Sequence, residues 1–218
     1  MPEGKGNILQ RDKETYAIVP RIPAGVTTPQ MLRKIADVAE KYCCPVIKIT
    51  GEQRIALVGI KEGELDQAWK DLGEDPAYAI GLCMRGVKAC PGNRFCKYGV
   101  QDSIGLALEL EKRYYGLELP AKFKMAVSGC PFSCPEPAVK DIGMKATRSG
   151  FNVMVGGTAG GRPRLADVVA ERLAPEEVLN LVDKIINFYK NNAKPRQRIG
   201  RFIDEIGLEN FKQSVLSA

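Results

Sequence analysis

The chain has 218 residues, 44% of them hydrophobic and 27% charged, which is typical of a soluble globular protein whose core needs no disulfide staple. Its 32 Lys and Arg against 26 Asp and Glu give a net charge of +6 without a basic block, so we expect no nucleic-acid partner. The longest apolar runs fall short of the roughly 18–20 residues of a membrane span, and the polar N-terminus is no signal peptide, so we expect no membrane partner and a cytoplasmic protein with reduced thiols.

The first part of the chain is predicted to form a β-α-β-β-α unit, which defines a first domain at residues 1–75. Thr28 can cap a helix that Pro29 opens, and Leu32 belongs to the apolar face of that helix. Turn residues around Gly51 predict a hairpin. The predicted elements, in chain order, are an extended arm at residues 1–13, a strand at 15–21, a helix at 29–41, strands at 46–50 and 54–60, and a helix at 62–72.

The second part of the chain is predicted to form an α/β domain at residues 76–218. Asp102 or Ser103 can cap its first helix, and Pro175 opens another. A glycine-rich loop at residues 156–161 precedes the helix that Pro175 opens. The predicted elements are a strand at residues 81–88, a helix at 103–115, strands at 123–128, 139–147 and 151–156, a helix from 175, and a last helical segment at 199–215.

Four of the seven cysteines form two pairs in loops that Pro and Gly bracket. Cys90 and Cys96 have Cys-x5-Cys spacing, and Cys130 and Cys134, after a gap of 33 residues, have Cys-x3-Cys spacing. Proline fixes the direction of the chain, and glycine lets the backbone approach a metal closely and leaves amides to point at sulfur. Because the chain has no histidine, sulfur or oxygen must bind any metal, and four thiolates in this setting fit an iron–sulfur cluster.

Two other interpretations of these cysteines stay open at this point. A structural zinc site usually has Cys-x2–4-Cys spacing, which Cys90 and Cys96 exceed. Four unrelated buried cysteines are the second alternative. The remaining thiols, Cys43, Cys44 and Cys83, have no partner at ligand spacing and are expected to be small buried residues.

The cysteine pattern and its surroundings resemble the sirohaem-containing sulfite and nitrite reductases. The similar segments are Cys90 to Ser103, Val127 to Cys134, the hairpin Thr50-Gly51-Glu52-Gln53-Arg54-Ile55, and the glycine pair after Val155. The resemblance extends from about residue 16 to residue 207. It implies an α+β fold, in which a ferredoxin-like β-α-β-β-α domain precedes an α/β domain that binds sirohaem and a [4Fe-4S] cluster.

The resemblance also implies which residues hold the cofactors. Cys90, Cys96 and Cys130 are implied to bind the cluster alone, whereas Cys134 is implied to be shared by the cluster and the sirohaem iron. The residues implied to contact sirohaem, a ring edged with carboxylates, are Thr50, Gln53, Asn93, Arg94, Gly156, Gly157, Arg162 and Arg164.

The implied reaction is the six-electron reduction of sulfite to sulfide or of nitrite to ammonia. Arg85, Lys122 and Lys124 are implied to bind this small oxyanion. Arg54 lies two residues beyond the family's position for another anion-binding arginine, on the same face of its strand. We expect Lys122 and Lys124 to donate protons, because an ammonium beside other cations has a lowered pKa.

The chain is short for this family, whose larger members contain two similar halves with the haem between them. We therefore expect a homodimer in which each site takes its cysteines from one chain and its cations from the other. A monomer with a more open site is the alternative. An external electron donor such as a ferredoxin is expected, because the chain has no dinucleotide or flavin fingerprint. The alternative function is a haem-free [4Fe-4S] electron-transfer protein or a partner subunit of a larger reductase.

Overall fold

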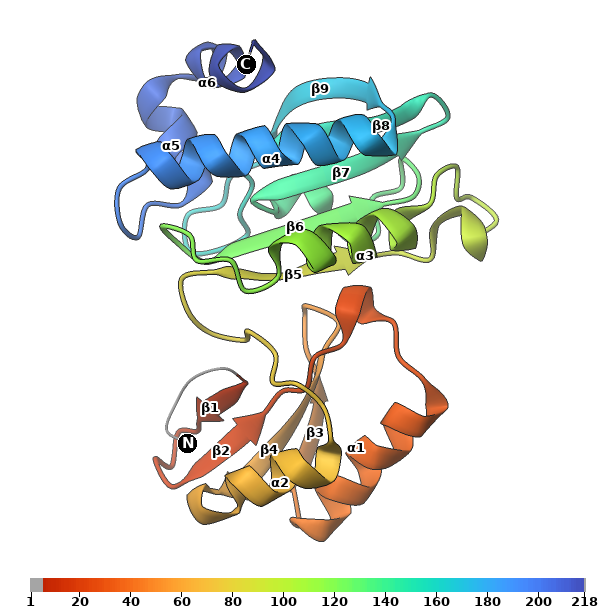
Figure 1. Cartoon of the computed structure of the whole chain (residues 1–218), viewed down its shortest axis with the longest axis vertical. Helices are drawn as coiled ribbons and strands as arrows, with labels where there is room; N and C mark the ends of the chain where they lie inside the picture. The colour runs from red at the N-terminus through yellow and green to blue at the C-terminus, as the bar shows by residue number, and fades with distance from the viewer. Residues whose placement is uncertain (1–5, 218) are drawn as a thin grey trace. The chain divides into compact units, whose positions relative to one another are not determined.

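The computed structural model describes residues 6–217 of the chain and divides into two units, Met1–Gly81 and Leu82–Ala218. Each unit packs its helices against a sheet of its own (Figure 1). Residues 1–5, which belong to the predicted arm, lie outside the described part of the chain.

The N-terminal unit is an antiparallel sheet in the order β1-β2-β4-β3. Its elements are β1 (Asn7–Leu9), β2 (Thr15–Ile18), α1 (Pro29–Lys41), β3 (Val46–Ile49), β4 (Ile55–Lys61) and α2 (Leu65–Leu72). The helices and the sheet share a core that includes Ile18, Ile35, Leu57 and Leu72, and the predicted β-α-β-β-α unit is confirmed. The predicted arm is wrong for residues 7–9, because their backbone pairs with β2 and forms an additional edge strand.

The start of α1 follows from its sequence. The Thr28 hydroxyl accepts the Met31 N–H at 3.2 Å, and Pro29 takes the first helical position. Leu32, which was predicted to lie on the apolar face, is instead 46% exposed. The buried residues follow the i, i+4, i+7, i+8 spacing of one helical face more closely, and they are Met31, Ile35, Val38 and Ala39.

The C-terminal unit is a five-stranded sheet in the order β5-β6-β7-β8-β9. The first three strands are parallel, and β8 and β9 are antiparallel to their neighbours. α3 packs on β5 and β6, and α4 packs on β8 and β9, with both helices over the same face of the sheet (Figure 1). The bounds are β5 (Met84–Ala89), α3 (Ser103–Tyr114), β6 (Phe123–Ser128), β7 (Ile142–Thr147), β8 (Gly150–Val155), β9 (Asp167–Leu173) and α4 (Pro175–Asn192).

Two features of this unit differ from the prediction. β9 was not predicted, because Asp167, Glu171 and Arg172 interrupt the apolar alternation of this edge strand. The last helical segment is two helices, α5 (Ile199–Ile206) and α6 (Leu208–Leu216), because Gly207 takes a left-handed φ of +86° between them. Within residues 6–217, no helix combines the length and the apolarity needed to cross a membrane.

Candidate functional site

The two cysteine pairs follow directly on two parallel strands. β5 ends at Ala89, one residue before Cys90, and β6 ends at Ser128, two residues before Cys130. The carboxyl ends of adjacent parallel strands meet at one edge of a sheet. The Gly129 N–H donates to Cys90 Sγ at 3.1 Å, so the two cysteine loops are in direct contact.

Glycine residues allow this contact. A Cβ on Gly129 would lie 2.6 Å from Gly92 Cα, and a Cβ on Gly99 would lie 2.3 Å from the Gly92 carbonyl carbon. Gly92 itself has a left-handed φ of +61°. The Ser103 hydroxyl, at the start of α3, donates to the Cys90 carbonyl at 2.8 Å. That bond fixes the loop after β5 internally. Close backbone packing and the hydrogen bond from the Val100 N–H to the Gly129 carbonyl, at 2.7 Å, hold this loop against the loop after β6.

The four thiols differ in exposure. Cys130 is buried, Cys90 and Cys96 are partly buried, and Cys134 is exposed. Phe132, in the second cysteine loop, is 69% exposed and packs edge-to-face on Tyr98 of the first, with ring centroids 5.2 Å apart. Within the described residues, no three His, Cys, Asp or Glu side chains are grouped closely enough to hold a metal ion.

The other three cysteines only partly follow the expectation of small buried residues. Cys83 is buried and Cys44 is partly buried, but Cys43 is exposed and adopts a left-handed φ of +49°. Cys43 follows the C-terminal end of α1, where the chain turns toward β3. Burial raises the pKa of the Cys44 thiol.

Three of the predicted anion-binding cations lie near the opposite, amino ends of the same strands. Arg85 is the second residue of β5, Lys122 directly precedes β6, and Lys124 is its second residue. Phe123, between the two lysines, packs on Tyr189 of α4, with ring centroids 5.7 Å apart. Side chains alternate along a strand, so Lys122 and Lys124 point to the face of the sheet opposite α4.

The neighbouring cations affect the pKa of Lys122. Partial desolvation lowers the pKa of Lys122, and the positive charges of Arg198, Arg85 and Lys124 lower it further. This is the direction expected for an ammonium that repels other cations and gives up its proton more readily.

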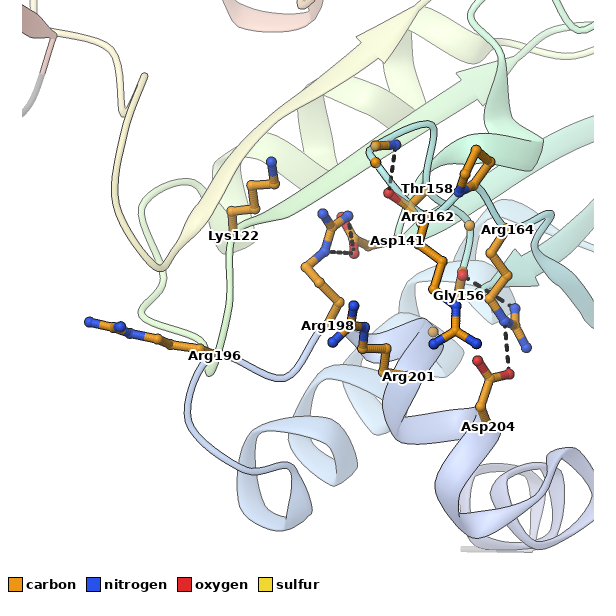
Figure 2. A pocket seen from close by; sticks show the side chains of 15 residues that line it. Lys122, Asp141, Gly156, Thr158, Arg162, Arg164, Arg196, Arg198, Arg201 and Asp204 are labelled. Carbon is orange, nitrogen blue, oxygen red and sulfur yellow. Dashed lines mark hydrogen bonds and ion pairs between the residues drawn. The ribbon is translucent and has the colours of Figure 1, made fainter.

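A pocket of about 570 Å³ opens at this end of the sheet (Figure 2). It brings together five of the predicted site residues, which are Lys122, Gly156, Gly157, Arg162 and Arg164, with three arginines that the sequence analysis missed, which are Arg196, Arg198 and Arg201. A Cβ on Gly157 would lie 2.5 Å from the Ala138 carbonyl oxygen, so the backbone itself forms part of the wall. A volume in this range suits an organic ligand rather than a bare oxyanion.

Asp141 organises the pocket wall. Its carboxylate forms a bidentate ion pair with Arg198, whose Nε donates to Oδ1 at 2.9 Å and whose Nη2 donates to Oδ2 at 2.8 Å, and it also accepts the backbone N–H of Lys124 at 2.9 Å. The Asp141 backbone carbonyl accepts the Gly156 N–H at 2.9 Å. Burial raises the pKa of Asp141 to about 6, although Arg198 and the Lys124 N–H act in the opposite direction.

Several predicted cofactor residues have partners within the protein. Arg164 pairs with Asp167 at 2.5 Å and with Asp204 at 3.0 Å, and Arg94 pairs with Asp102 at 2.5 Å. Among the described residues, Arg162 and Arg201 have no carboxylate partner, and Figure 2 shows both extending into the pocket. The cations of this pocket therefore divide into those that hold the wall and those that are available to a ligand.

The predicted residues of the N-terminal unit build a turn. The Thr50 hydroxyl accepts the Arg54 N–H at 3.2 Å, and Gln53 adopts a left-handed φ of +57°. Arg54 is buried and donates to the Tyr78 carbonyl at 3.3 Å, while its second terminal nitrogen is buried without a hydrogen-bond partner. Thr50, Gln53 and Arg54 thus share the hairpin between β3 and β4.

Two family models match the chain. The model described as the nitrite and sulphite reductase 4Fe-4S domain matches residues 80–218, and the nitrite/sulfite reductase ferredoxin-like half domain matches residues 8–75. This chain belongs to the nitrite and sulfite reductase family. The predicted family is confirmed, and membership in this oxidoreductase family supports an iron–sulfur cofactor.

Curated relatives of this reductase family differ widely in length. The assimilatory-type sulfite reductase of Nitratidesulfovibrio vulgaris is 45% identical over 98% of this chain and 98% of its own. The nitrite reductase [NAD(P)H] of Bacillus subtilis is 42% identical over 96% of this chain, which covers only 26% of that protein. The family thus includes a sulfite reductase of this size as well as much longer nitrite reductases.

Solved structures confirm the predicted α+β fold of this family member. The crystal structure of dissimilatory sulfite reductase I matches 92% of this chain and 69% of its own with a TM-score of 0.81 at 14% identity. The NirA protein of Mycobacterium tuberculosis matches 100% of this chain and 44% of its own with a TM-score of 0.79 at 19% identity. At these identities the likeness concerns the fold.

One signal in the sequence of this family member points to the missed arginines. Arg198 directly precedes α5, and Arg201 lies in its first turn. Cations at the N-terminus of a helix face the positive end of its dipole, which is unfavourable unless an anion lies beside them. Asp141 supplies that anion for Arg198.

Proposed function

We propose that this protein is a sirohaem-dependent reductase of sulfite, or of nitrite, with a [4Fe-4S] cluster held by Cys90, Cys96, Cys130 and Cys134. The observation that carries the proposal is the contact between Gly129 N–H and Cys90 Sγ at 3.1 Å, which joins the two cysteine loops. Thiolates from two such loops are the ligand set of a cubane cluster, and backbone N–H groups directed at sulfur help to set its potential.

The residues present also suit sirohaem. The exposed thiol of Cys134 is the accessible one for a second metal. Lys122, Arg162 and Arg201 present positive charge in a pocket large enough for a carboxylate-bearing organic group. The other residues proposed to contact sirohaem are Thr50, Gln53, Asn93, Arg94, Gly156, Gly157 and Arg164.

The protein's own side chains would supply charge and protons. When bound, sirohaem and the cluster supply the redox chemistry that takes six electrons to sulfite or nitrite. Arg85, Lys122 and Lys124 would neutralise the oxygens of the anion, with Arg54 as a fourth cation. Lys122 and Lys124 are the proposed proton donors, and the lowered pKa of Lys122 favours release of its proton.

The proposal includes a homodimer with shared sites. The cations lie near the start of β6 and the cysteines follow its end, and a six-residue strand spans about 20 Å. In a symmetric dimer, the cysteines of one chain would face the cations of the other. Mixing Cys134→Ser protein with a Lys122→Met/Lys124→Met variant should restore part of the activity, and no recovery in verified mixed dimers would reject the shared site.

A haem-free electron-transfer protein, or a partner subunit of a larger reductase, is the second candidate. The separation of cations and cysteines on β6 favours it, since such a chain need not bring both to one ligand. In either case an external donor such as a ferredoxin would deliver electrons. A cytoplasmic location is part of both proposals, because thiolate ligands must stay reduced.

An absorption spectrum of anaerobically purified protein tests these proposals, followed by turnover with sulfite and with nitrite from a chemical electron donor. Haem bands with a broad sulfide-to-iron shoulder, and turnover of at least one anion, are expected for the reductase. The shoulder alone would establish the haem-free alternative. A colourless protein after anaerobic reconstitution with iron and sulfide would reject the cluster itself.

A further inference from the structure

Two lysines and one glutamate meet beside the second cysteine loop. Lys88 Nζ lies 3.2 Å from Glu136 Oε2, and Lys140 Nζ lies 3.5 Å from the same oxygen. The side chains of Lys88 and Lys140 are only 16% and 9% exposed, whereas that of Glu136 is 61% exposed. We refer to these three residues as the lysine–glutamate triad.

The triad has a surplus of positive charge. Among the described residues, Glu136 is the one carboxylate that pairs with Lys88 or Lys140. Two ammonium groups against one carboxylate leave one positive charge that the protein does not balance. Lysine is rarely buried to this extent unless its charge is paired, because desolvation of an ammonium is unfavourable. A further negative charge close by would complete the arrangement.

The triad residues flank the cysteines in the sequence, and backbone hydrogen bonds hold two of them in place. Lys88 lies in β5, two residues before Cys90, and Glu136 lies two residues after Cys134. The Glu136 N–H donates to the Ser133 carbonyl at 2.8 Å, and the Lys140 carbonyl accepts the Gly157 N–H at 2.9 Å. Backbone hydrogen bonds therefore hold both the glutamate and one of the lysines.

We propose that Lys88 and Lys140 raise the reduction potential of the cluster by placing a net positive charge beside it. The inference rests on the cluster part of the proposed function and needs no sirohaem. A cluster held by four thiolates is anionic, and reduction adds one more negative charge. A fixed positive charge nearby stabilises the reduced form more than the oxidised form, and net charge and burial are among the factors that set cluster potentials.

Burial makes the triad different from other cations of the cysteine loops. Lys97 follows Cys96 directly, but it is exposed and stacks over the Tyr98 ring, with its Nζ 4.8 Å from the ring centroid. Mobile ions screen exposed charges over about 3 Å at 1 M salt and screen buried ones much less. The effect of the triad on the potential should therefore persist at high salt, whereas that of Lys97 should fade.

The test is the midpoint potential of the cluster in haem-free protein, followed by EPR during an anaerobic redox titration. Lys88→Met and Lys140→Met should each lower the potential, and Glu136→Gln should raise it. The double variant Lys140→Met/Glu136→Gln keeps the net charge of the triad at +1, so its potential should return close to that of the wild type. Lys88→Arg, which keeps the charge, should also stay close to it.

Two control variants complete the experiment. Lys97→Met should lower the potential at low salt but not at 1 M salt, and Lys112→Met, whose side chain is 80% exposed at the end of α3, should change nothing. Equal potentials in Lys88→Met, Glu136→Gln and the wild type, with the cluster intact in all three, would overturn the inference and leave the proposed function standing. If one lysine variant loses its cluster, the other variant and Glu136→Gln still shift the net charge in opposite directions and decide the question.

Discussion

The two ends of the five-stranded sheet are built by different means. At the carboxyl ends of β5 and β6, close glycine packing and backbone hydrogen bonds hold two cysteine loops together. At the amino ends, charge dominates, and Asp141 and Arg198 hold a pocket in which Arg162 and Arg201 remain available to a ligand. Substitutions should therefore act on the cysteine end through steric fit and lost ligands, and on the other end through charge.

The largest effect is expected at the cysteine end. Cys134→Ser should abolish turnover, because the exposed thiol is the proposed link between two metal centres, and Cys90→Ser should prevent assembly of the cluster. Iron content per chain and sulfite or nitrite turnover measure the two effects. Cys43→Ser, an exposed thiol of the N-terminal unit, is the matched control and should leave both unchanged.

The next largest effect is expected at the amino end. Removing a hydrogen bond to a charged group loses roughly 1.5–3 kcal/mol, so Lys122→Met and Lys124→Met should each lower kcat/KM by about 10–100-fold. The absorption spectrum of the cluster should stay unchanged in both variants. That result would show that the amino end of the sheet affects turnover without affecting the cluster at the cysteine end. An unaltered kcat/KM in both variants would remove these lysines from the proposed site.

A smaller effect is expected from steric strain in the cysteine loops. Gly129→Ala places a Cβ 2.6 Å from Gly92 Cα and should lower the free energy of unfolding by about 1–3 kcal/mol and reduce cluster retention. Urea denaturation measures this change. Gly161→Ala lies in open space, with no atom within 4 Å of its new Cβ, and should be neutral.

The last effect is the pH dependence that Asp141 brings to the amino end. The pKa of its buried carboxyl is about 6 in the folded protein against an ordinary 3.8. Between about pH 4 and pH 6, the folded state holds more protons at this site than the unfolded state does, so the contribution of Asp141 to the free energy of unfolding falls as pH rises.

Comparison of Asp141→Asn with the wild type isolates this contribution. The difference between their free energies of unfolding should change across pH 4–6 and level off above pH 7, where Asp141 is ionised in both states. A constant difference would mean that the neighbouring charges of Arg198, Lys122 and Lys124 fully offset its burial.

Local sequence determined much of this protein. Thr28 and Pro29 mark the start of α1, Phe123 to Ser128 form a strand, and Pro175 opens α4, all as predicted, because capping, β-propensity and proline geometry act within a few residues. The sequence alone also identified the family and the two cysteine pairs, since spacing is a property of the chain.

Local sequence failed where the deciding contact was distant. Nothing within a few residues of Asn7 or Asp167 indicates that β1 and β9 gain partners, because pairing with β2 and β8 supplies their stabilisation. Gly207 broke a helix that periodicity had extended, since the apolar pattern continues through it.

Only the tertiary structure decided which cations pair with carboxylates and which remain available to a ligand. The sequence shows Arg164, Arg198 and Arg201 as three similar cations, but the fold pairs the first two with carboxylates and leaves the third in the pocket. It likewise places Lys88 and Lys140 on one carboxylate beside the cysteines, from positions 52 residues apart. Electrostatic energy depends on distance and burial, and both are set by chain segments that are remote in sequence.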